Sequence, residues 1–217
     1  QYFNYLVDTE YRESSPCRGL SIKVKPPIVR QETLFTSAEL ELLLERENRY
    51  KHLKHRNKSI LSLLVYQGLS TENIIKLRLD DVDFDAGTIY IRATKQLNRR
   101  TLELKAKQIH VIYQYYQEHR LELNKYGNYL FYGISGQKLT IDIIHNLVKI
   151  MRPLFPSRKL TTTKIRQSVI SNWINEKHIP IEEVQLMSGQ KWLSTVERYK
   201  REDRVDKRDK INKYFPI

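Results

Sequence analysis

Two stretches of the chain are rich in basic residues and almost free of acidic ones. Between Asp85 and Glu118 the only acidic residue is Glu103, and between Asp142 and Glu176 there is none. Lysine and arginine side chains supply most contacts to the phosphates of a nucleic acid. The two stretches predict one phosphate-binding groove if the fold brings them together, and two solvated faces if it does not. The basic residues that we expect to contact a nucleic acid, in and after these stretches, are Arg92, Arg99, Arg100, Lys159, Lys164 and Lys191.

Three short patterns follow one another closely in the last third of the chain. They occupy residues Thr163–Ser168, Gln185–Gln190 and Leu193–Tyr199. Arginine can bind a phosphate group through two parallel hydrogen bonds, and a tyrosine hydroxyl can act as a nucleophile. Tyr199 is one of 14 tyrosines, so only its place ten residues after Gly189 singles it out.

Composition limits the class of protein. The 217 residues include 38 Lys and Arg against 25 Asp and Glu, a formal net charge of +13, which favours a polyanionic partner. Cys17 is the only cysteine, which excludes an internal disulfide and a multi-cysteine zinc site. No apolar run approaches the roughly 18 residues of a membrane span, and Tyr2–Arg12 does not resemble a signal peptide. We expect a fragment of a longer cytoplasmic protein, trimmed before Gln1.

The chain divides where prolines interrupt regular structure, at Ser14–Pro16 and Lys25–Pro27. We therefore expect one unit over residues 1–30 and a second over residues 31–217. The second unit opens with a capping box, in which Thr36 and Glu39 each satisfy a backbone N–H group of the other. Apolar spacing predicts helices over about 36–44, 57–67, 70–79, 105–123, 141–151, 162–175, 180–188 and 195–200, and a charged helical tail over 203–217.

The spacing of apolar residues changes from helical to alternating in one region, which indicates a small sheet among these helices. Thr88–Arg92 and Arg100–Leu104 alternate apolar and polar residues, and they flank the turn-like segment Lys95–Asn98. This arrangement predicts an antiparallel hairpin, and Tyr129–Tyr132 is a candidate third strand. The predicted fold class is mainly α with a small antiparallel β-sheet, an α+β fold.

In order and spacing, these motifs resemble the tyrosine recombinases, the phage integrase family. That family has three motifs in this order: a His-x-Leu-Arg-His-Ser box, a Leu-Gly-His turn and a Ser-Thr-Thr-x-x-Tyr run. Arg166, Gly189 and Tyr199 occupy the corresponding positions here, and the spacing between them matches without an insertion or deletion. Gln67–Leu69 and Leu77–Asp83 are similar to the family's Gly-Leu-Arg helix and its exit into the sheet. The resemblance implies a tyrosine recombinase catalytic domain over residues 31–217, preceded by the end of a core-binding domain and a linker.

The resemblance implies site-specific DNA recombination, and we expect the integrase of a mobile genetic element. In this chemistry a tyrosine cleaves a DNA strand and holds it through a 3′-phosphotyrosyl bond, without a metal or a cofactor. Tyr199 would be the nucleophile, Arg166 would bind the phosphate, and the hairpin residue Lys95 would protonate the leaving 5′ oxygen.

Three positions depart from the family pattern. The family's first arginine falls on Ser70, and two of its histidines fall on Thr163 and Gln190. Loss of one donor that stabilises a transition state typically slows a reaction about 10²–10³-fold. Ser70 also fits a structural role, because serine is a preferred residue at a helix N-cap.

These departures leave several functions open. A relative that binds DNA without cleaving it is one alternative, and a type IB topoisomerase with the same tyrosine chemistry is another. An unrelated basic helical domain, such as an RNA binder, is a third. The resemblance further implies double-stranded DNA as partner and a homo-oligomer on DNA, a tetramer in the synapse. The apolar face of the tail, formed by Ile211, Tyr214 and Phe215, would dock on a neighbouring copy.

Overall fold

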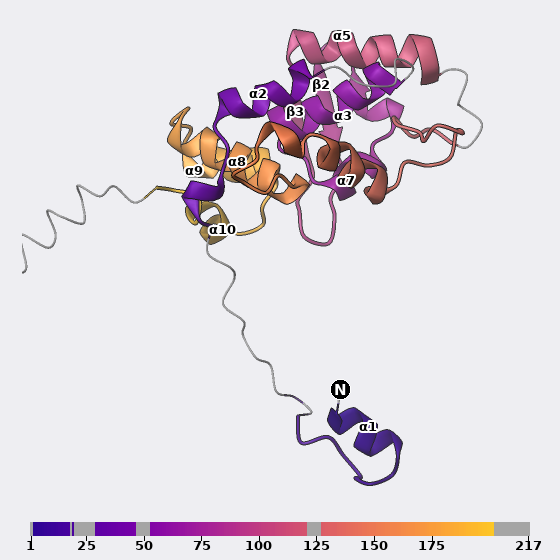
Figure 1. Cartoon of the computed structure of the whole chain (residues 1–217), viewed down its shortest axis with the longest axis vertical. Coiled ribbons are helices and arrows are strands. Elements are labelled where there is room, and N and C mark those ends of the chain that lie inside the picture. Colours follow the sequence, from indigo (N-terminus) through magenta and orange to yellow (C-terminus); the bar gives the residue numbers. More distant parts are fainter. Residues whose placement is uncertain (1, 18, 20–28, 47–52, 121–126, 202–217) are drawn as a thin grey trace, which may run out of the picture.

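A computed structural model of the chain shows helices gathered around a small sheet (Figure 1). The structure describes residues 2–17, 19, 29–46, 53–120 and 127–201. Its α-helices are α1 (Tyr2–Asp8), α2 (Ser37–Glu45), α3 (Lys54–Tyr66), α4 (Thr71–Lys76), α5 (Ala106–Tyr115), α7 (Ile141–Ile150), α8 (Thr162–Asn175), α9 (Ile181–Ser188) and α10 (Leu193–Glu197). Shorter turns are the 3-10 helices η1 (Gln31–Thr33), η3 (Leu79–Asp81) and η6 (Arg152–Leu154), and the π-helix η4 (Tyr116–Arg120).

The sheet is antiparallel and follows the order of the sequence. Its strands are β1 (Val82–Asp83), β2 (Thr88–Ile91) and β3 (Arg100–Glu103). Ile89 of β2 lies opposite Val82 on one side and Leu102 on the other. Because side chains alternate between the two faces of a strand, Ile89, Ile91 and Leu102 are buried in the core together. The predicted hairpin is confirmed.

The prediction of a strand at Tyr129–Tyr132 is wrong. The third strand is β1, which lies before the hairpin, and the 129–132 segment forms only isolated bridges to Arg78 and Lys138. Residues 130–132 are nonetheless buried. A short apolar run is common to buried strands and to other buried segments, so its composition alone could not distinguish them.

Helix α3 runs through the apolar core. It packs against α2, α5 and α8, and it is buried almost continuously from Ser59 to Val65. Ile60 and Leu63 are fully buried, and Ile165 of α8 belongs to the same core cluster. Such burial on all sides explains why α3 has apolar residues around most of its circumference. The core thereby fixes α8, which carries Arg166, against α3.

Several helix ends lie where the sequence predicts them. The Thr36 hydroxyl accepts from the Glu39 N–H at 3.2 Å, and the Glu39 carboxylate accepts from the Thr36 N–H at 2.9 Å. Ser70 caps α4 by accepting from the Asn73 N–H at 3.2 Å. Gly68 follows the end of α3 with φ +56°, a conformation that glycine adopts without steric cost. The capping box and the N-cap of Ser70 are confirmed.

Four helices differ from their predicted bounds. Helix α3 begins at Lys54 and α4 ends at Lys76, where the sequence predicted 57–67 and 70–79. Helix α10 begins at Leu193 and ends at Glu197, where the sequence predicted 195–200. Tyr199 therefore lies in a turn after the helix, and its N–H donates to Val196. The helix predicted over 105–123 is α5, which ends at Tyr115 and continues as the π-helical turn η4.

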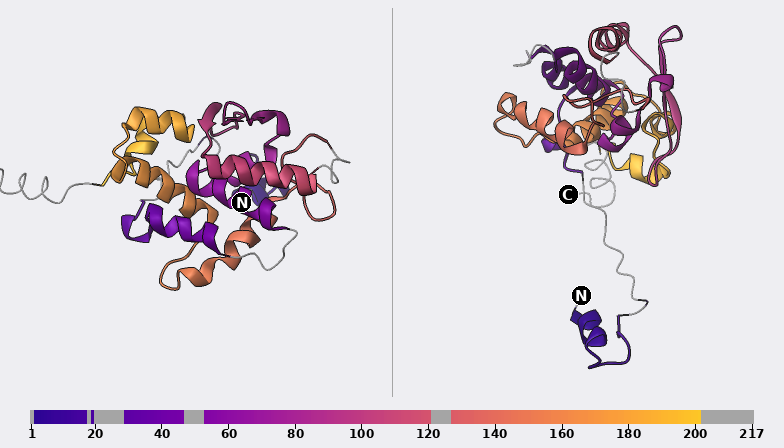
Figure 2. Two further views of the ribbon diagram at one scale, coloured as in Figure 1. Left: turned by 90° about the horizontal axis from the view of Figure 1, so that it is seen from above. Right: turned by 90° about the vertical axis from the view of Figure 1, so that its right-hand side faces the viewer.

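Helix α1 lies at the N-terminal end of the described residues. Figures 1 and 2 draw α1 apart from the other helices, and the predicted division near residue 30 stays a prediction. The predicted tail helix over 203–217 lies outside the described residues. In the part of the chain that the structure describes, no helix has the length and apolar character needed to cross a membrane.

Candidate active site

Tyr199 is held in place by its backbone. Its carbonyl accepts from Gln31 Nε2 at 3.1 Å and from Asn175 Nδ2 at 2.8 Å. These donors belong to η1 and α8, so the turn after α10 is tied to both elements. The side chain is 8% exposed. The place of the phenol is thus set by tertiary contacts rather than by a helix of its own.

The Tyr199 phenol, although mostly buried, lies beside polar groups. Arg166 and Arg198 are close enough to favour its charged form, and a side-chain hydrogen bond with Gln190 acts in the same direction. Burial has the largest effect and raises the pKa of Tyr199 above the ordinary value of a phenol. The hydroxyl is therefore neutral at physiological pH, and any reaction through its oxygen must remove a proton.

Arg166 connects the ends of two helices. From α8 its Nη1 donates to the carbonyl of Gly68, after α3, and its Nη2 donates to the carbonyl of Ser188, in α9, at 2.8 Å. Burial lowers the pKa of Arg166 to about 10, and the nearby Tyr199 opposes this shift. Arg166 therefore remains charged at neutral pH, and the structure brings it together with Tyr199 and Gln190.

A second arginine reaches the same place from the sheet. Arg100, the first residue of β3, is 8% exposed, and among the described residues its Nε and Nη2 atoms have no hydrogen-bond partner. Its Nη1 donates to the Asn98 carbonyl at 3.3 Å. Burial lowers the pKa of Arg100 to about 9, and repulsion from Arg166 contributes to the shift. Two guanidinium groups thus share one buried region, and no ion pair recorded among the described residues includes either of them.

Contacts between the β2–β3 hairpin and the turn after α9 position Arg100. Leu97 pairs with Gln190 in an isolated bridge, and the Asn98 N–H donates to the Gly189 carbonyl at 2.8 Å. Gly189 has φ +70°, and a Cβ there would overlap the Arg100 guanidinium and lie 2.9 Å from the Asn98 carbonyl oxygen. Figure 2 shows the hairpin along one edge of the body, beside the yellow C-terminal segment. Glycine is thus required both for the turn and for the close approach of Arg100.

Lys95 does not join this cluster. It is exposed in the turn between β2 and β3, where the Thr94 N–H donates to Leu97. No hydrogen bond or ion pair recorded for the described residues links Lys95 to Tyr199 or Arg166. The structure therefore leaves its amine at the outer end of the hairpin.

Two of the three altered family positions also lie outside the cluster. The Ser70 hydroxyl accepts from the Asn73 N–H and donates to Asn73 Oδ1 at 2.8 Å, so its hydrogen bonds are used within α4. Thr163 is exposed in the first turn of α8. Only Gln190 contacts Tyr199.

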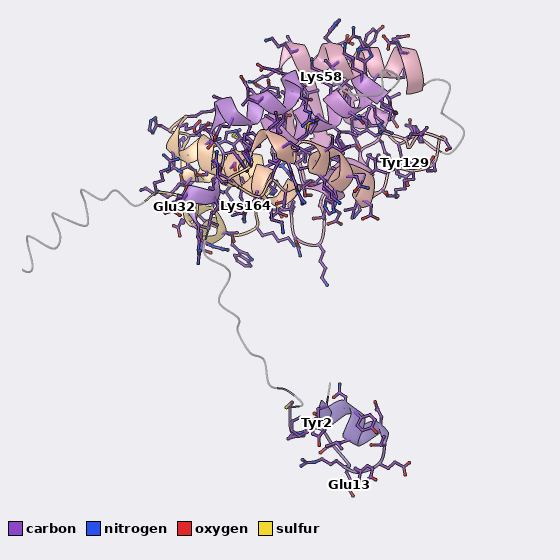
Figure 3. All side chains as sticks on the ribbon, viewed as in Figure 1. Tyr2, Glu13, Glu32, Lys58, Tyr129 and Lys164 are labelled. Atoms are coloured by element: carbon purple, nitrogen blue, oxygen red, sulfur yellow. The ribbon has the colours of Figure 1, made fainter. Side chains whose placement is uncertain are left out.

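The basic side chains predicted to contact DNA have different surroundings. Arg92 forms an ion pair with Asp81 at 2.7 Å. Lys164 donates to the Thr33 hydroxyl at 2.6 Å. Figure 3 labels Lys164 and Glu32, the residue that precedes Thr33 in the sequence. Arg100 is buried, whereas Arg92, Arg99, Lys159 and Lys191 are exposed, and of these four only Arg92 has an ion pair recorded among the described residues.

The described residues hold no evident metal site. Within them, no group of three or more His, Cys, Asp and Glu side chains could bind a metal ion. His55 pairs instead with Glu118 at 2.7 Å. The expectation of chemistry without metal or cofactor stays a prediction.

Comparison with known proteins identifies the family. The sequence model described as "Phage integrase family" matches residues 33–205. The chain belongs to the phage integrase family. This integrase-family chain is 26% identical over 180 residues to tyrosine recombinase XerD of Staphylococcus haemolyticus, a match that covers 82% of the chain and 61% of the relative. It is 26% identical over 207 residues to tyrosine recombinase XerC of Oceanobacillus iheyensis, with 91% and 65% covered.

Solved structures share the fold of this integrase-family chain. A structure described as the XerH site-specific recombinase bound to palindromic difH substrate, a post-cleavage complex, matches with a TM-score of 0.71 and 22% identity, covering 98% of this chain and 64% of that one. XerA recombinase matches with a TM-score of 0.68 and 18% identity, covering 100% and 82%. The predicted fold of a tyrosine recombinase catalytic domain is confirmed. The chain spans less than two thirds of the length of the two curated relatives.

The sequence predicted Arg100 as a DNA-contacting residue and gave no sign that it lies close to Arg166. A signal for its burial was present, because alternation in β3 puts Arg100 on the same face as the buried Leu102. A charged residue at an inward position of a strand is uncommon without a partner or a function. Its approach to Gly189 depends on long-range docking, which no local pattern encodes.

Proposed function

We propose that this integrase-family chain carries out site-specific DNA recombination, with Tyr199 as the residue that cleaves and rejoins DNA strands. The observation that carries the proposal is the meeting of Tyr199, Arg166 and Gln190 in one buried cluster. The spacing of Arg166, Gly189 and Tyr199 along the chain is that of the family's motifs. Relatives named as tyrosine recombinases, and a neighbour described as a post-cleavage complex with its DNA substrate, support the same activity.

The proposed reaction exchanges one phosphate ester for another. The Tyr199 hydroxyl oxygen attacks a backbone phosphorus, a tyrosine–phosphorus bond forms, and the bond from phosphorus to the 5′ oxygen breaks. The phenolic proton passes to solvent or a basic group, and the leaving 5′ oxygen takes up a proton. Arg166 stabilises the negative charge that develops on the phosphate oxygens. Reversal with a 5′ hydroxyl from another strand completes recombination without an external energy source.

Lys95 is the proposed donor of the proton to the leaving oxygen. Its exposed position at the end of the hairpin suits a group that meets DNA only after binding. A general acid must come within hydrogen-bond reach of the oxygen it protonates. The role therefore requires the DNA to lie across the hairpin, close to Tyr199.

The proposed partner is duplex DNA bound by several copies of the chain. The net charge of +13 and the exposed Arg99, Lys159 and Lys191 favour contact with a phosphate backbone. The proposal includes a tetramer in the synapse, joined through the tail over 203–217. A source in a mobile genetic element and a cytoplasmic location stay predictions from the sequence.

One set of contacts favours a second function, a DNA-binding relative that does not cleave. Ser70 and Thr163 replace groups that the family uses on the phosphate, and neither contacts Tyr199. Both terminal nitrogens of Arg166 already donate to backbone carbonyls. A bound phosphate would then have fewer free donors than in an unaltered member of the family.

A nicked duplex distinguishes the two functions. Random-sequence duplexes that the chain binds tightly are first selected, and a nick is then placed beside each candidate phosphate so that the cleaved end diffuses away. Recombinase activity predicts a covalent protein–DNA adduct with the wild-type chain and none with Tyr199→Phe. Tight binding without any adduct across the full set of nicked duplexes would favour the non-cleaving relative.

A further inference from the structure

We infer that Arg100 is a second phosphate-binding guanidinium of this site and takes the place of the arginine that the family pattern has at Ser70. The inference deepens the proposed function and rests on it for the reaction. Its anion-binding part can be tested without cleavage. Four observations lead to it.

The first observation is an incomplete set of hydrogen bonds. Buried polar side-chain atoms in native proteins nearly always have a partner, and a buried charge without one is costly. Arg100 is 8% exposed, and its Nε and Nη2 atoms are both buried without a partner among the described residues. Such an arrangement in a native protein calls for an explanation, and a bound ion that completes the hydrogen bonds is one.

The second observation is which atoms lack partners. The Nε–H and an Nη2–H of a guanidinium point in parallel from the same edge, and this pair forms two hydrogen bonds with two oxygens of one phosphate. Nη1, at the other edge of Arg100, already donates to the Asn98 carbonyl. The edge left over in Arg100 is thus the one with the geometry for a phosphodiester.

The third observation is the charge of the surroundings. Arg166 is near enough to repel Arg100, and the phenol of Tyr199 interacts with Arg166. The ion pairs recorded among the described residues place no carboxylate on either arginine. An anion between the two guanidinium groups would relieve this repulsion, and a phosphodiester beside Tyr199 is an anion of suitable size and charge.

The fourth observation is that Ser70 cannot supply a guanidinium to the site, whereas Gly189 leaves room for one. The Ser70 hydroxyl is used in capping α4 and carries no charge, so it cannot replace a guanidinium. Gly189, in contrast, leaves space that a Cβ would fill, and the Arg100 guanidinium occupies that space. The fold therefore brings an arginine to the site from β3 rather than from the start of α4.

The covered position of Arg100 has a consequence for binding. Both unpaired nitrogens are shielded from solvent, so a phosphate reaches them only if the hairpin tip separates from the turn after α9. The contacts that hold the tip there include the Asn98–Gly189 hydrogen bond and the Leu97–Gln190 bridge. Binding of DNA would then exchange these contacts for contacts with the phosphate.

Thermal unfolding with inorganic phosphate tests the anion site by itself. The variant is Arg100→Met, and the control is Lys177→Met, which removes an exposed positive charge outside the site and outside the predicted DNA contacts. Phosphate, compared with sodium chloride of the same ionic strength, should raise the Tm of the wild type and of Lys177→Met and leave that of Arg100→Met unchanged. Without phosphate, Arg100→Met should be at least as stable as the wild type, because a buried unpaired charge is gone.

Two results would overturn the inference. One is an equal phosphate-dependent rise in Tm for all three proteins. The other is a fall of several degrees in the Tm of Arg100→Met without phosphate, while Arg100→Lys keeps the Tm of the wild type. That pattern would show that the positive charge stabilises the folded chain by itself and needs no bound anion.

Adduct formation on the nicked duplexes tests the role in the reaction. Arg100→Met should slow the adduct about 10²-fold or more, and Lys177→Met should leave the rate within a few-fold of wild type. If the wild type forms no adduct but Arg100→Met loses the phosphate effect, the proposed function fails and the anion site stands. If the wild type forms the adduct and both variants match it, the role of Arg100 fails and the proposed function stands.

Discussion

At Tyr199, burial and charge act on the hydroxyl in opposite directions. Burial raises the pKa of the phenol, while Arg166, Arg198 and the hydrogen bond from Gln190 favour the ionised form. In the DNA-free chain burial has the greater effect, which keeps the Tyr199 hydroxyl protonated. A phosphate at the site would change the neighbours of the hydroxyl, so the proposed nucleophile would be in a resting form in the free chain.

The raised pKa of Tyr199 predicts a loss of stability at alkaline pH. In the unfolded chain the phenol ionises near its ordinary value of about 10, whereas in the folded chain it ionises at higher pH. Between these values the unfolded state binds fewer protons, so the free energy of unfolding falls as pH rises. Urea unfolding from pH 8 to 11 should show a steeper fall for wild type than for Tyr199→Phe. Tyr90→Phe, which removes the hydroxyl of an exposed tyrosine, is the control and should follow the wild-type pH dependence. Parallel curves of unfolding free energy against pH for wild type and Tyr199→Phe would contradict the prediction.

Arg166 has a structural and a chemical role in this account. Arg166→Ala removes charged hydrogen bonds to the Gly68 and Ser188 carbonyls, and each such bond is worth about 1.5–3 kcal/mol. We expect a lower free energy of unfolding in urea and no detectable DNA adduct. Arg166→Lys keeps the charge without the paired geometry, so it should recover stability in part and adduct formation little. Full activity of Arg166→Lys would show that only the charge matters.

At the scale of elements, the site is formed where the β2–β3 hairpin meets the turn between α9 and α10. Neither element contains the site alone. The hairpin brings Arg100, and the turn brings Gln190 and is followed by Tyr199 after α10. The contact between them depends on Gly189, whose missing side chain admits the hairpin.

Gly189→Ala should therefore damage the site through its elements. The substitution places a Cβ at φ +70° and against the Arg100 guanidinium. A non-glycine residue in the left-handed region costs about 1–3 kcal/mol, and the overlap with Arg100 adds to it. Thermal unfolding should show a clear drop in Tm, together with slower adduct formation. Gly87→Ala has a similar φ of +65° and meets only the end of the Ile109 side chain, at 3.1 Å, so it measures mainly the backbone cost, and equal losses in the two variants would contradict the account.

The elements also show what the sequence could predict. Periodicity and end signals located the hairpin, α8, the capping box at Thr36 and the end of α3 at Gly68, because these depend on neighbouring residues. The prediction of a strand at Tyr129–Tyr132 is wrong because a segment buried among helices has the same run of apolar residues as a buried strand.

At the candidate site, the spacing of the motifs predicted Arg166 beside Tyr199. The burial of Arg100 and the exposure of Lys95 depend on how the hairpin docks on a turn almost 90 residues later. No local pattern contains that contact. The sequence could therefore indicate the types of reactive residue, but not which basic residue of the hairpin lies close to Arg166.

At the scale of the whole molecule, the positive charge has several uses. Part of it is engaged within the fold, as in the Arg92–Asp81 ion pair and the Lys164–Thr33 hydrogen bond. Part is exposed, as at Lys159 and Lys191. Exposed side chains that are not already paired with an acidic group of the fold are the ones available to neutralise a DNA backbone and release its counterions.

Binding of duplex DNA should therefore depend strongly on salt. An interface with about six phosphate contacts loses about 10³-fold in affinity between 50 and 200 mM salt. Lys191→Ala should reduce the slope of log affinity against log salt by about one contact, while Arg92→Ala should leave it nearly unchanged. Fluorescence anisotropy with a labelled duplex measures both slopes. An affinity independent of salt would contradict DNA binding through the phosphate backbone.

The most direct measurement is to identify the residue that becomes attached to DNA. The adduct formed on a nicked duplex is digested with protease and nuclease, and mass spectrometry locates the nucleotide on one of the 14 tyrosines. The account predicts that the nucleotide is carried by Tyr199. Attachment to any other side chain, or a tightly bound duplex that never becomes attached, would contradict it.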